Sequence, residues 1–169
     1  MKYIEIDQSI KIDDTRDDTI LAYSNEKRYS ILIPISAKRE IIKELYEKQK
    51  NKAIFKIKLF CSGLFCLLRD VIMEDIIITI DNEFDGREND VKGILLNLIW
   101  KINPRFDKRD LRIKEIGKKS RAHEIAIKVH RKQIKPNKIL TKQELLSHIW
   151  WGLSPWTWPH PSSCKKHPA

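Results

Sequence analysis

Two aspartates in this sequence each follow a short apolar run that is typical of a β-strand. Asp7 closes the stretch IEID, and Asp81 closes the stretch ITID. If these strands lie side by side in parallel, both carboxylates reach the same edge of the sheet. Two carboxylates there repel each other unless a cation lies between them, so the pair predicts a Mg²⁺ or Mn²⁺ site with oxygen ligands. Asp is also a common turn residue, which is the alternative explanation for either residue taken alone. Glu83, two residues after Asp81, is a reserve ligand if the strand continues.

A third segment, IGKKSRAHEIA (residues 116–126), carries further side chains suited to phosphate chemistry. Ser120 is expected to cap a helix in which His123 occupies the third position. A helix N-terminus disfavours imidazolium, which keeps the ring neutral and able to bind a metal or accept a proton. Lys118 and Lys119 precede the cap and would face a phosphate. Taken alone, His123 also fits a solvated histidine on the flank of a helix.

The apolar periodicity predicts the elements that would hold these residues. Strands are expected at KYIEIDQS, over two runs of TILAYSNEKRYSILIPI, at EDIIITID and at DLRIKEIG. Helices are expected after Ser36, over ENDVKGILLNLIW and after Ser120. The segment KAIFKIKLFCSGLFCLLRD alternates briefly like a strand, but its longer helical spacing favours a helix. The order β-β-β-α-β-α-β-α predicts an α/β fold with a mixed five-stranded sheet and helices on its faces.

Charge is distributed unevenly along the 169 residues. Residues 101–169 carry 17 Lys and Arg against five Asp and Glu, a net of +12, whereas residues 1–100 carry a net of −2. A basic half beside a mildly acidic half suits a polyanion that must also meet a carboxylate cluster, so a nucleic-acid partner is expected. The heavily charged surface of a heat-adapted protein is the alternative.

The composition also bounds the class of protein. No apolar run is long enough to cross a bilayer, no secretory leader is visible, and three cysteines without C-x-x-C spacing suggest neither disulfides nor structural zinc. A cytoplasmic protein without a membrane partner is therefore expected. Residues 1–147 are predicted to form one domain. Residues 148–169, rich in Trp and Pro, are predicted to form a disordered tail or, alternatively, a docking peptide.

The order of elements, with acids ending the first and fourth strands, resembles the ribonuclease H-like nuclease superfamily over residues 2–132. IDQS looks like its first-strand motif, ITID looks like its fourth-strand aspartate, and SRAHEIA resembles the start of its last helix. The resemblance implies a site made of Asp7, Asp81 and His123. Many members add a Glu from the first helix, for which this sequence offers several candidates (Glu40, Glu44, Glu47 and Asp70).

The resemblance implies a two-metal-ion nuclease that hydrolyses phosphodiester bonds of a structured nucleic acid, whether hybrid, duplex or junction. Asp7, Asp81, Glu83 and His123 are the expected metal ligands for Mg²⁺ or Mn²⁺. The expected nucleic-acid contacts are Lys118, Lys119, Ser120 and Arg121. A non-catalytic nucleic-acid-binding module of the same fold is the alternative, and an adaptor that uses the Trp/Pro tail is a third. The choice between DNA and RNA and the oligomeric state remain open from sequence.

Overall fold

A mixed sheet lies at the centre of the molecule in the computed structural model, which describes residues 1–149. Its strand order is β5-β4-β1-β2-β3-β6, and β2 is antiparallel to both of its neighbours while the other neighbouring pairs are parallel. The strands are β1 (Lys2–Ser9), β2 (Thr19–Ser24), β3 (Arg28–Ile33), β4 (Ile76–Ile80), β5 (Leu111–Ile113) and β6 (Lys138–Ile139). The predicted α/β class and mixed sheet are therefore confirmed.

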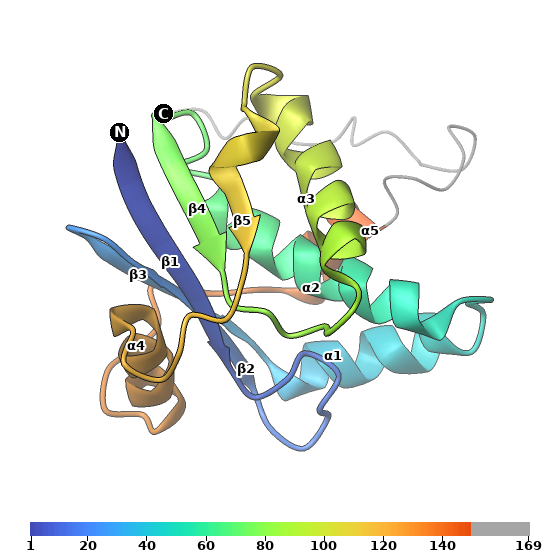
Figure 1. The fold of residues 1–169 in the computed structure, drawn as a ribbon. Helices are drawn as coiled ribbons and strands as arrows, with labels where there is room; N and C mark the ends of the chain where they lie inside the picture. Colours follow the sequence, from blue (N-terminus) through green and yellow to red (C-terminus); the bar gives the residue numbers. More distant parts are fainter. Residues whose placement is uncertain (150–169) are drawn as a thin grey trace, which may run out of the picture.

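Helices cover both faces of this sheet (Figure 1). Among the α-helices of residues 1–149, the short helix α4 (Arg121–His130) lies against one face of the sheet, and the others lie on the opposite side. None of the helices within residues 1–149 combines the length and hydrophobicity that a bilayer-spanning segment requires. The helices are α1 (Ile35–Ile41), which continues as the π-helix η1 (Ile42–Tyr46), α2 (Lys52–Leu68), α3 (Glu88–Ile102), the 3-10 helix η2 (Lys108–Asp110), α4 (Arg121–His130) and α5 (Lys142–Ile149).

The alternation of β1 divides its side chains between two hydrophobic cores. Ile4 and Ile6 point into the larger core, which β1 shares with α1, α2, α3 and α5. Asp7 therefore points to the face that α4 covers, as the period of two in a strand requires. The core on that face is small and includes Ala22 of β2 and Ala126 of α4, both fully buried. These small side chains allow α4 to approach the sheet closely, which matters for the site described below.

The sheet has one strand more than the five predicted. β6 is only two residues long and pairs in parallel with β3, opposite Ile31 and Leu32. A run this short carries no recognisable alternation, so the sequence pattern did not indicate it. The chain then forms α5, whose last two residues are His148 and Ile149, at the start of the segment assigned to the tail. The rest of the predicted tail lies outside the described residues.

The predicted helix cap at Ser36 is wrong. α1 begins one residue earlier, at Ile35, with Pro34 in the capping position. The N–H of Ile35 donates to Asp18 Oδ1 at 2.7 Å, so the acceptor comes from the acidic segment before β2. The fully buried Lys38 reinforces this contact, because its ammonium donates to backbone carbonyls of the same segment. A long-range partner therefore replaces the local cap.

Candidate metal centre and its basic border

The two predicted aspartates meet where β1 and β4 run side by side. Ile6 pairs with Ile80, and the N–H of Asp81 donates to the carbonyl of Ile6 at 2.9 Å. Asp81 is the first residue after β4, as predicted. β1, however, does not end at Asp7, because its pairing with β2 continues through Ser9. Asp7 therefore lies inside a paired strand, which holds its backbone more rigidly than a strand end would.

Three carboxylates gather at this edge of the sheet. One oxygen each of Asp7, Asp81 and Glu83 lies within 4.8 Å of the others. Asp7 is buried, while Asp81 and Glu83 are partly exposed, so the cluster opens toward solvent on one side. Glu83 comes from the loop that follows β4, and the reserve ligand that the sequence offered therefore lies in the cluster, although the strand does not continue to it. Hard oxygen donors at this spacing match the ligands that Mg²⁺ and Mn²⁺ prefer.

The acids near the first helix do not belong to this cluster. Glu40 and Glu44 form ion pairs with Lys142 of α5, and Glu47 lies 4.0 Å from the ammonium of Lys52. Asp70 is exposed beyond the end of α2. The structure thus gives the first-helix carboxylates surface pairings with other parts of the chain.

His123 contacts the cluster through one of its members. It is the third residue of α4, and Ser120 caps the helix by accepting a hydrogen bond from the N–H of His123 at 3.0 Å, both as predicted. Its ring atom Nδ1 lies 2.7 Å from Asp7 Oδ2. His123 is not part of the three-carboxylate group itself. The imidazole therefore orients Asp7, in the way that a histidine–carboxylate pair fixes a ligand around a metal.

Backbone and amide groups hold the three carboxylates in place. Asp7 Oδ1 accepts a hydrogen bond from the N–H of Gln8 at 2.6 Å, and Asp81 Oδ1 accepts one from the N–H of Ile116 at 2.7 Å. The side chain of Gln8 lies close enough to Glu83 to lower the pKa of that carboxyl. Sequence reasoning assigned no role to Gln8 or to the Ile116 backbone. Gln8 follows Asp7 directly in IDQS, but its contact with Glu83 depends on the path of a distant loop.

The electrostatics of the cluster favour a bound cation. Burial raises the pKa of Asp7 above its usual range, the hydrogen bond from His123 opposes this, and the charge of Asp81 adds to it. Burial also raises the pKa of Glu83, as do the charges of Asp81 and Asp7, whereas the side chain of Gln8 and the charge of Lys11 lower it. Within residues 1–149, no Lys or Arg forms an ion pair with Asp7, Asp81 or Glu83. Apart from the contact of His123 with Asp7, the negative charge of the cluster is left for an ion of opposite sign.

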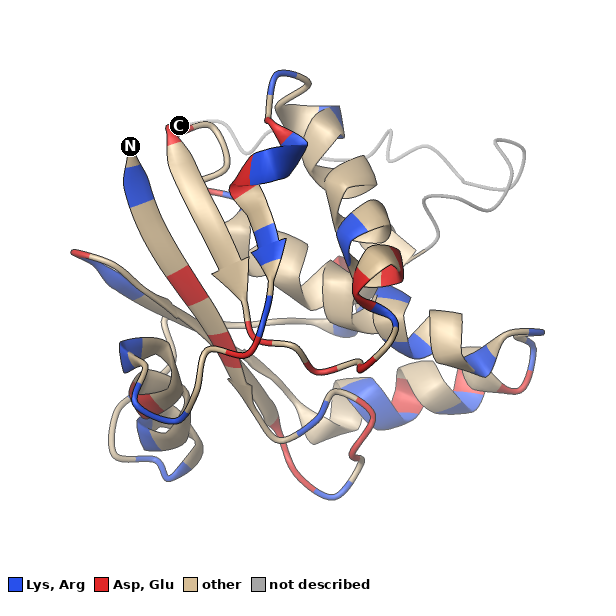
Figure 2. Ribbon diagram, in the orientation of Figure 1, with Lys and Arg blue, Asp and Glu red and all other residues tan. Residues whose placement is uncertain are grey.

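A basic segment borders the cluster. The Ile116 hydrogen bond to Asp81 fixes the start of the segment that leads to α4, and Figure 2 shows Lys and Arg along β5, this segment and α4. Lys118, Lys119 and Arg121 are exposed there, whereas the hydroxyl of Ser120 is occupied by the helix cap.

No family model matches the chain, and neither a curated protein nor a solved structure matches it. The geometry of this edge is therefore the basis for any assignment of function.

Proposed function

We propose that this protein is a metal-dependent nuclease that hydrolyses phosphodiester bonds of a structured nucleic acid. The observation that carries the proposal is the convergence of Asp7, Asp81 and Glu83 at one sheet edge, without a Lys or Arg ion pair to them in the described residues. Acid clusters that are purely structural usually form such ion pairs, because unpaired buried charge is costly.

Each residue of the site has a definable role in this proposal. Asp7, Asp81 and Glu83 would hold Mg²⁺ or Mn²⁺, which supplies activation of water and stabilisation of the leaving oxygen. His123 keeps the Asp7 carboxylate oriented through its Nδ1 contact, and the N–H of Ile116 does the same for Asp81. Lys118 and Lys119 lie exposed on the bordering segment, where they would contact phosphates of the bound strand.

The arrangement of elements supports the ribonuclease H-like fold as part of the proposal. β1 and β4 are parallel neighbours, their acids meet at one edge, and α4 delivers His123 to the same place. These features match the motifs IDQS, ITID and SRAHEIA on which the resemblance rests. β6 and α5 follow the part of the chain that the resemblance covers.

A cleavage panel tests the function. The substrates are an RNA/DNA hybrid, double-stranded RNA, duplex DNA and a four-way junction, each with Mg²⁺, with Mn²⁺ and with EDTA. The protein is compared with its Asp7→Asn and Asp81→Asn variants. Asp17→Asn is the matched control, because Asp17 contacts His130 of α4 at 2.8 Å, outside the cluster.

We expect at least one substrate to be cut in the presence of metal and none to be cut in EDTA. Cleavage should be lost in Asp7→Asn and in Asp81→Asn, and it should be retained in Asp17→Asn. Salt-dependent binding without cleavage would instead favour the non-catalytic binding module. Absence of both binding and cleavage would overturn the nucleic-acid assignment as a whole.

A further inference from the structure

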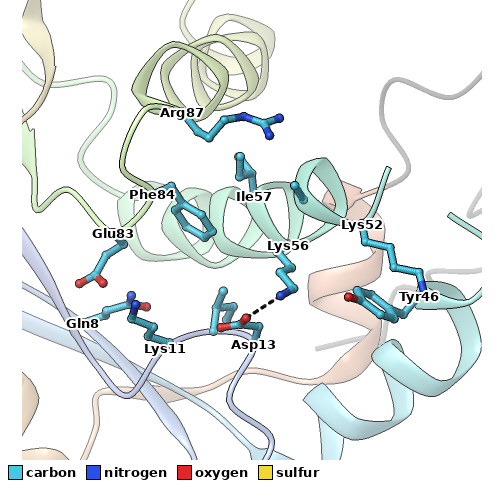
Figure 3. A pocket seen from close by; sticks show the side chains of 12 residues that line it. Gln8, Lys11, Asp13, Tyr46, Lys52, Lys56, Ile57, Glu83, Phe84 and Arg87 are labelled. Carbon is cyan, nitrogen blue, oxygen red and sulfur yellow. Dashed lines mark ion pairs between the residues drawn. The ribbon is translucent and has the colours of Figure 1, made fainter. Parts of the chain in front are cut away.

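A pocket of about 280 Å³ lies beside the carboxylate cluster. Figure 3 shows Gln8 and Glu83 at one end of it and Tyr46 and Lys52 at the other, with the Asp13–Lys56 ion pair between the two ends. Glu83 belongs both to the pocket and to the cluster. A ligand in this pocket would therefore lie directly next to the ions that the cluster would hold.

Aromatic rings and cations share the lining of this pocket. The ring of Phe84 packs on its inner side against Phe60, with centroids 5.4 Å apart, and lines the pocket. Tyr46 lines the far end, and the ammonium of Lys52 lies 4.6 Å from its ring centre. The lining contains four cationic residues and two carboxylates. These are Lys11, Lys52, Lys56 and Arg87 on one side of the count and Asp13 and Glu83 on the other. A flat, uncharged ring attached to an anionic group complements such a lining.

One buried polar atom at the pocket points to a hydrogen-bonding ligand. Gln8 is only 8% exposed, and its side-chain oxygen Oε1 has no hydrogen-bond partner among residues 1–149. Gln8 lines the pocket next to Glu83, so the unpaired Oε1 lies just behind the pocket surface. Buried acceptors are normally satisfied, so this atom calls for an N–H or O–H donor from whatever fills the space. Nucleobases and ribose both carry such donors.

We propose that this pocket binds one unpaired nucleotide of the nucleic acid, adjacent to the bond that is cut. The assignment rests on the nuclease proposed above, and it narrows the substrate to one that carries an unpaired nucleotide near the scissile phosphate. Phe84 contacts the base, Gln8 Oε1 accepts a hydrogen bond from the nucleotide, and the lysines of the lining contact its phosphate. An already unpaired base enters without the cost of breaking a base pair.

Binding measurements with three related probes test this proposal. The probes are a fully paired duplex, the same duplex with one unpaired pyrimidine nucleotide, and the same duplex with an abasic residue at that position. Each is made in DNA and in RNA, and affinity is measured by fluorescence anisotropy in EDTA, so that no metal-dependent cleavage occurs. Free nucleoside monophosphate is a fourth probe, which separates a nucleic-acid site from a site for a free nucleotide.

The protein is compared with three single variants. Phe84→Leu keeps the apolar contact with Phe60 but removes the ring that faces the pocket. Gln8→Met keeps the length of the side chain but removes the acceptor. Tyr29→Leu is the matched control, because Tyr29 is a partly buried aromatic residue of β3 that stacks on Tyr23 and does not line the pocket.

We expect the probe with the unpaired nucleotide to bind about tenfold more tightly than the abasic probe, because stacking of one base on an aromatic side chain increases affinity by about that factor. This difference should disappear in Phe84→Leu, shrink in Gln8→Met and persist in Tyr29→Leu. The mononucleotide should bind more weakly than the duplex that carries the unpaired base.

Equal binding of all three duplexes, with clear salt dependence, would overturn the pocket assignment and leave the nuclease proposal standing. Tighter binding of the mononucleotide than of any duplex would overturn the assignment in favour of a free nucleotide. If no probe binds, both proposals fail.

Discussion

The Nδ1 atom of His123 lies 2.7 Å from Oδ2 of Asp7, although 116 positions separate the two residues in the chain. The contact depends on how closely α4 approaches the sheet. Ala122 and Ala126 of α4 are fully buried, and Ala22, which pairs with Asp7 across β1 and β2, is also fully buried. Larger side chains at these positions would hold α4 farther away and would separate the imidazole from the carboxylate.

This relationship predicts that His123 acts on metal binding through Asp7. His123→Ala should raise the Mn²⁺ concentration needed for half-maximal cleavage by about 10- to 100-fold, the usual loss when a residue that orients a metal ligand is removed. A metal titration of the cleavage rate measures the shift. His130→Ala is the control, because His130 lies on the same helix and contacts Asp17 instead. Equal shifts in both variants would mean that the effect reflects α4 stability and not the orientation of Asp7.

Glu83 is expected to be as necessary for cleavage as the two aspartates. Glu83→Gln should lower the rate at least tenfold at a fixed Mg²⁺ concentration, because the amide removes one negative ligand from the cluster. Glu44→Gln changes a carboxylate that pairs with Lys142 and should leave the rate unchanged. The reverse result, with Glu44 required and Glu83 dispensable, would place the third ligand on the first helical segment.

The contrast between these two glutamates shows what local sequence can and cannot indicate. Asp7 and Asp81 were predictable because each follows a strand whose apolar pattern is clear, and Ser120 and His123 because a cap defines the positions after it. Glu83 was predicted as a reserve ligand only if the strand continued past Asp81, but β4 ends at Ile80 and Glu83 lies in an irregular loop, where its spacing from Asp81 does not determine where its side chain points. Its place in the cluster depends on the pairing of β1 with β4 and on the contact with Gln8, both of which join distant parts of the chain.

Lys118 and Lys119 are expected to supply phosphate contacts that carry no sequence preference. Replacing both with Ala should reduce the slope of log affinity against log salt by about 2, since each phosphate contact contributes nearly one. The measurement is a salt titration of binding to a duplex in EDTA. Lys27→Ala combined with Arg28→Ala is the matched control, because this exposed pair lies at the β2–β3 turn, at the end of the sheet away from Asp7. A larger effect from the control pair would place the bound duplex at the other end.

The packing of α5 against the rest of the fold is expected to weaken at acidic pH, because His148 is partly buried in it. Burial lowers the pKa of His148 from 6.5 to about 4, and its ring lies edge-on to Phe65 with centroids 4.7 Å apart. Between those two pH values the unfolded chain binds a proton that the folded chain does not, so the free energy of unfolding falls as pH drops from 6.5 toward 4. Above pH 6.5 this contribution is fully present.

The contribution can be isolated by comparing the protein with His148→Phe, which keeps a ring against Phe65. From pH 7 to pH 4 the parent should lose about 2 kcal/mol more unfolding free energy than the variant. Urea unfolding at several pH values measures both curves, and all other titrating groups are common to the two proteins. Parallel curves would show that His148 titrates in the folded protein as it does in the unfolded chain.

α5 also illustrates why the C-terminal part of the fold was not predicted. Its sequence, KQELLSHI, is only eight residues long, and β6 before it contributes two exposed residues. Neither α5 nor β6 has a hydrophobic periodicity long enough to identify a helix or a strand from sequence alone. α5 is held by contacts with α2 and by the hydrogen bond from Ser62 Oγ to the carbonyl of Leu145 at 2.6 Å. These tertiary contacts become visible only once α2 is placed.

Binding of Mn²⁺ tests directly, without any assumption about the substrate, whether Asp7, Asp81 and Glu83 form a divalent-metal site. Free Mn²⁺ measured by electron paramagnetic resonance during a titration reports how many ions the protein holds and how tightly. We expect saturable binding that is lost or strongly weakened in Asp81→Asn and in Glu83→Gln, and retained in Asp17→Asn. No saturable binding by the parent protein, or equal binding by all four proteins, would contradict the assignment of this sheet edge as a metal site.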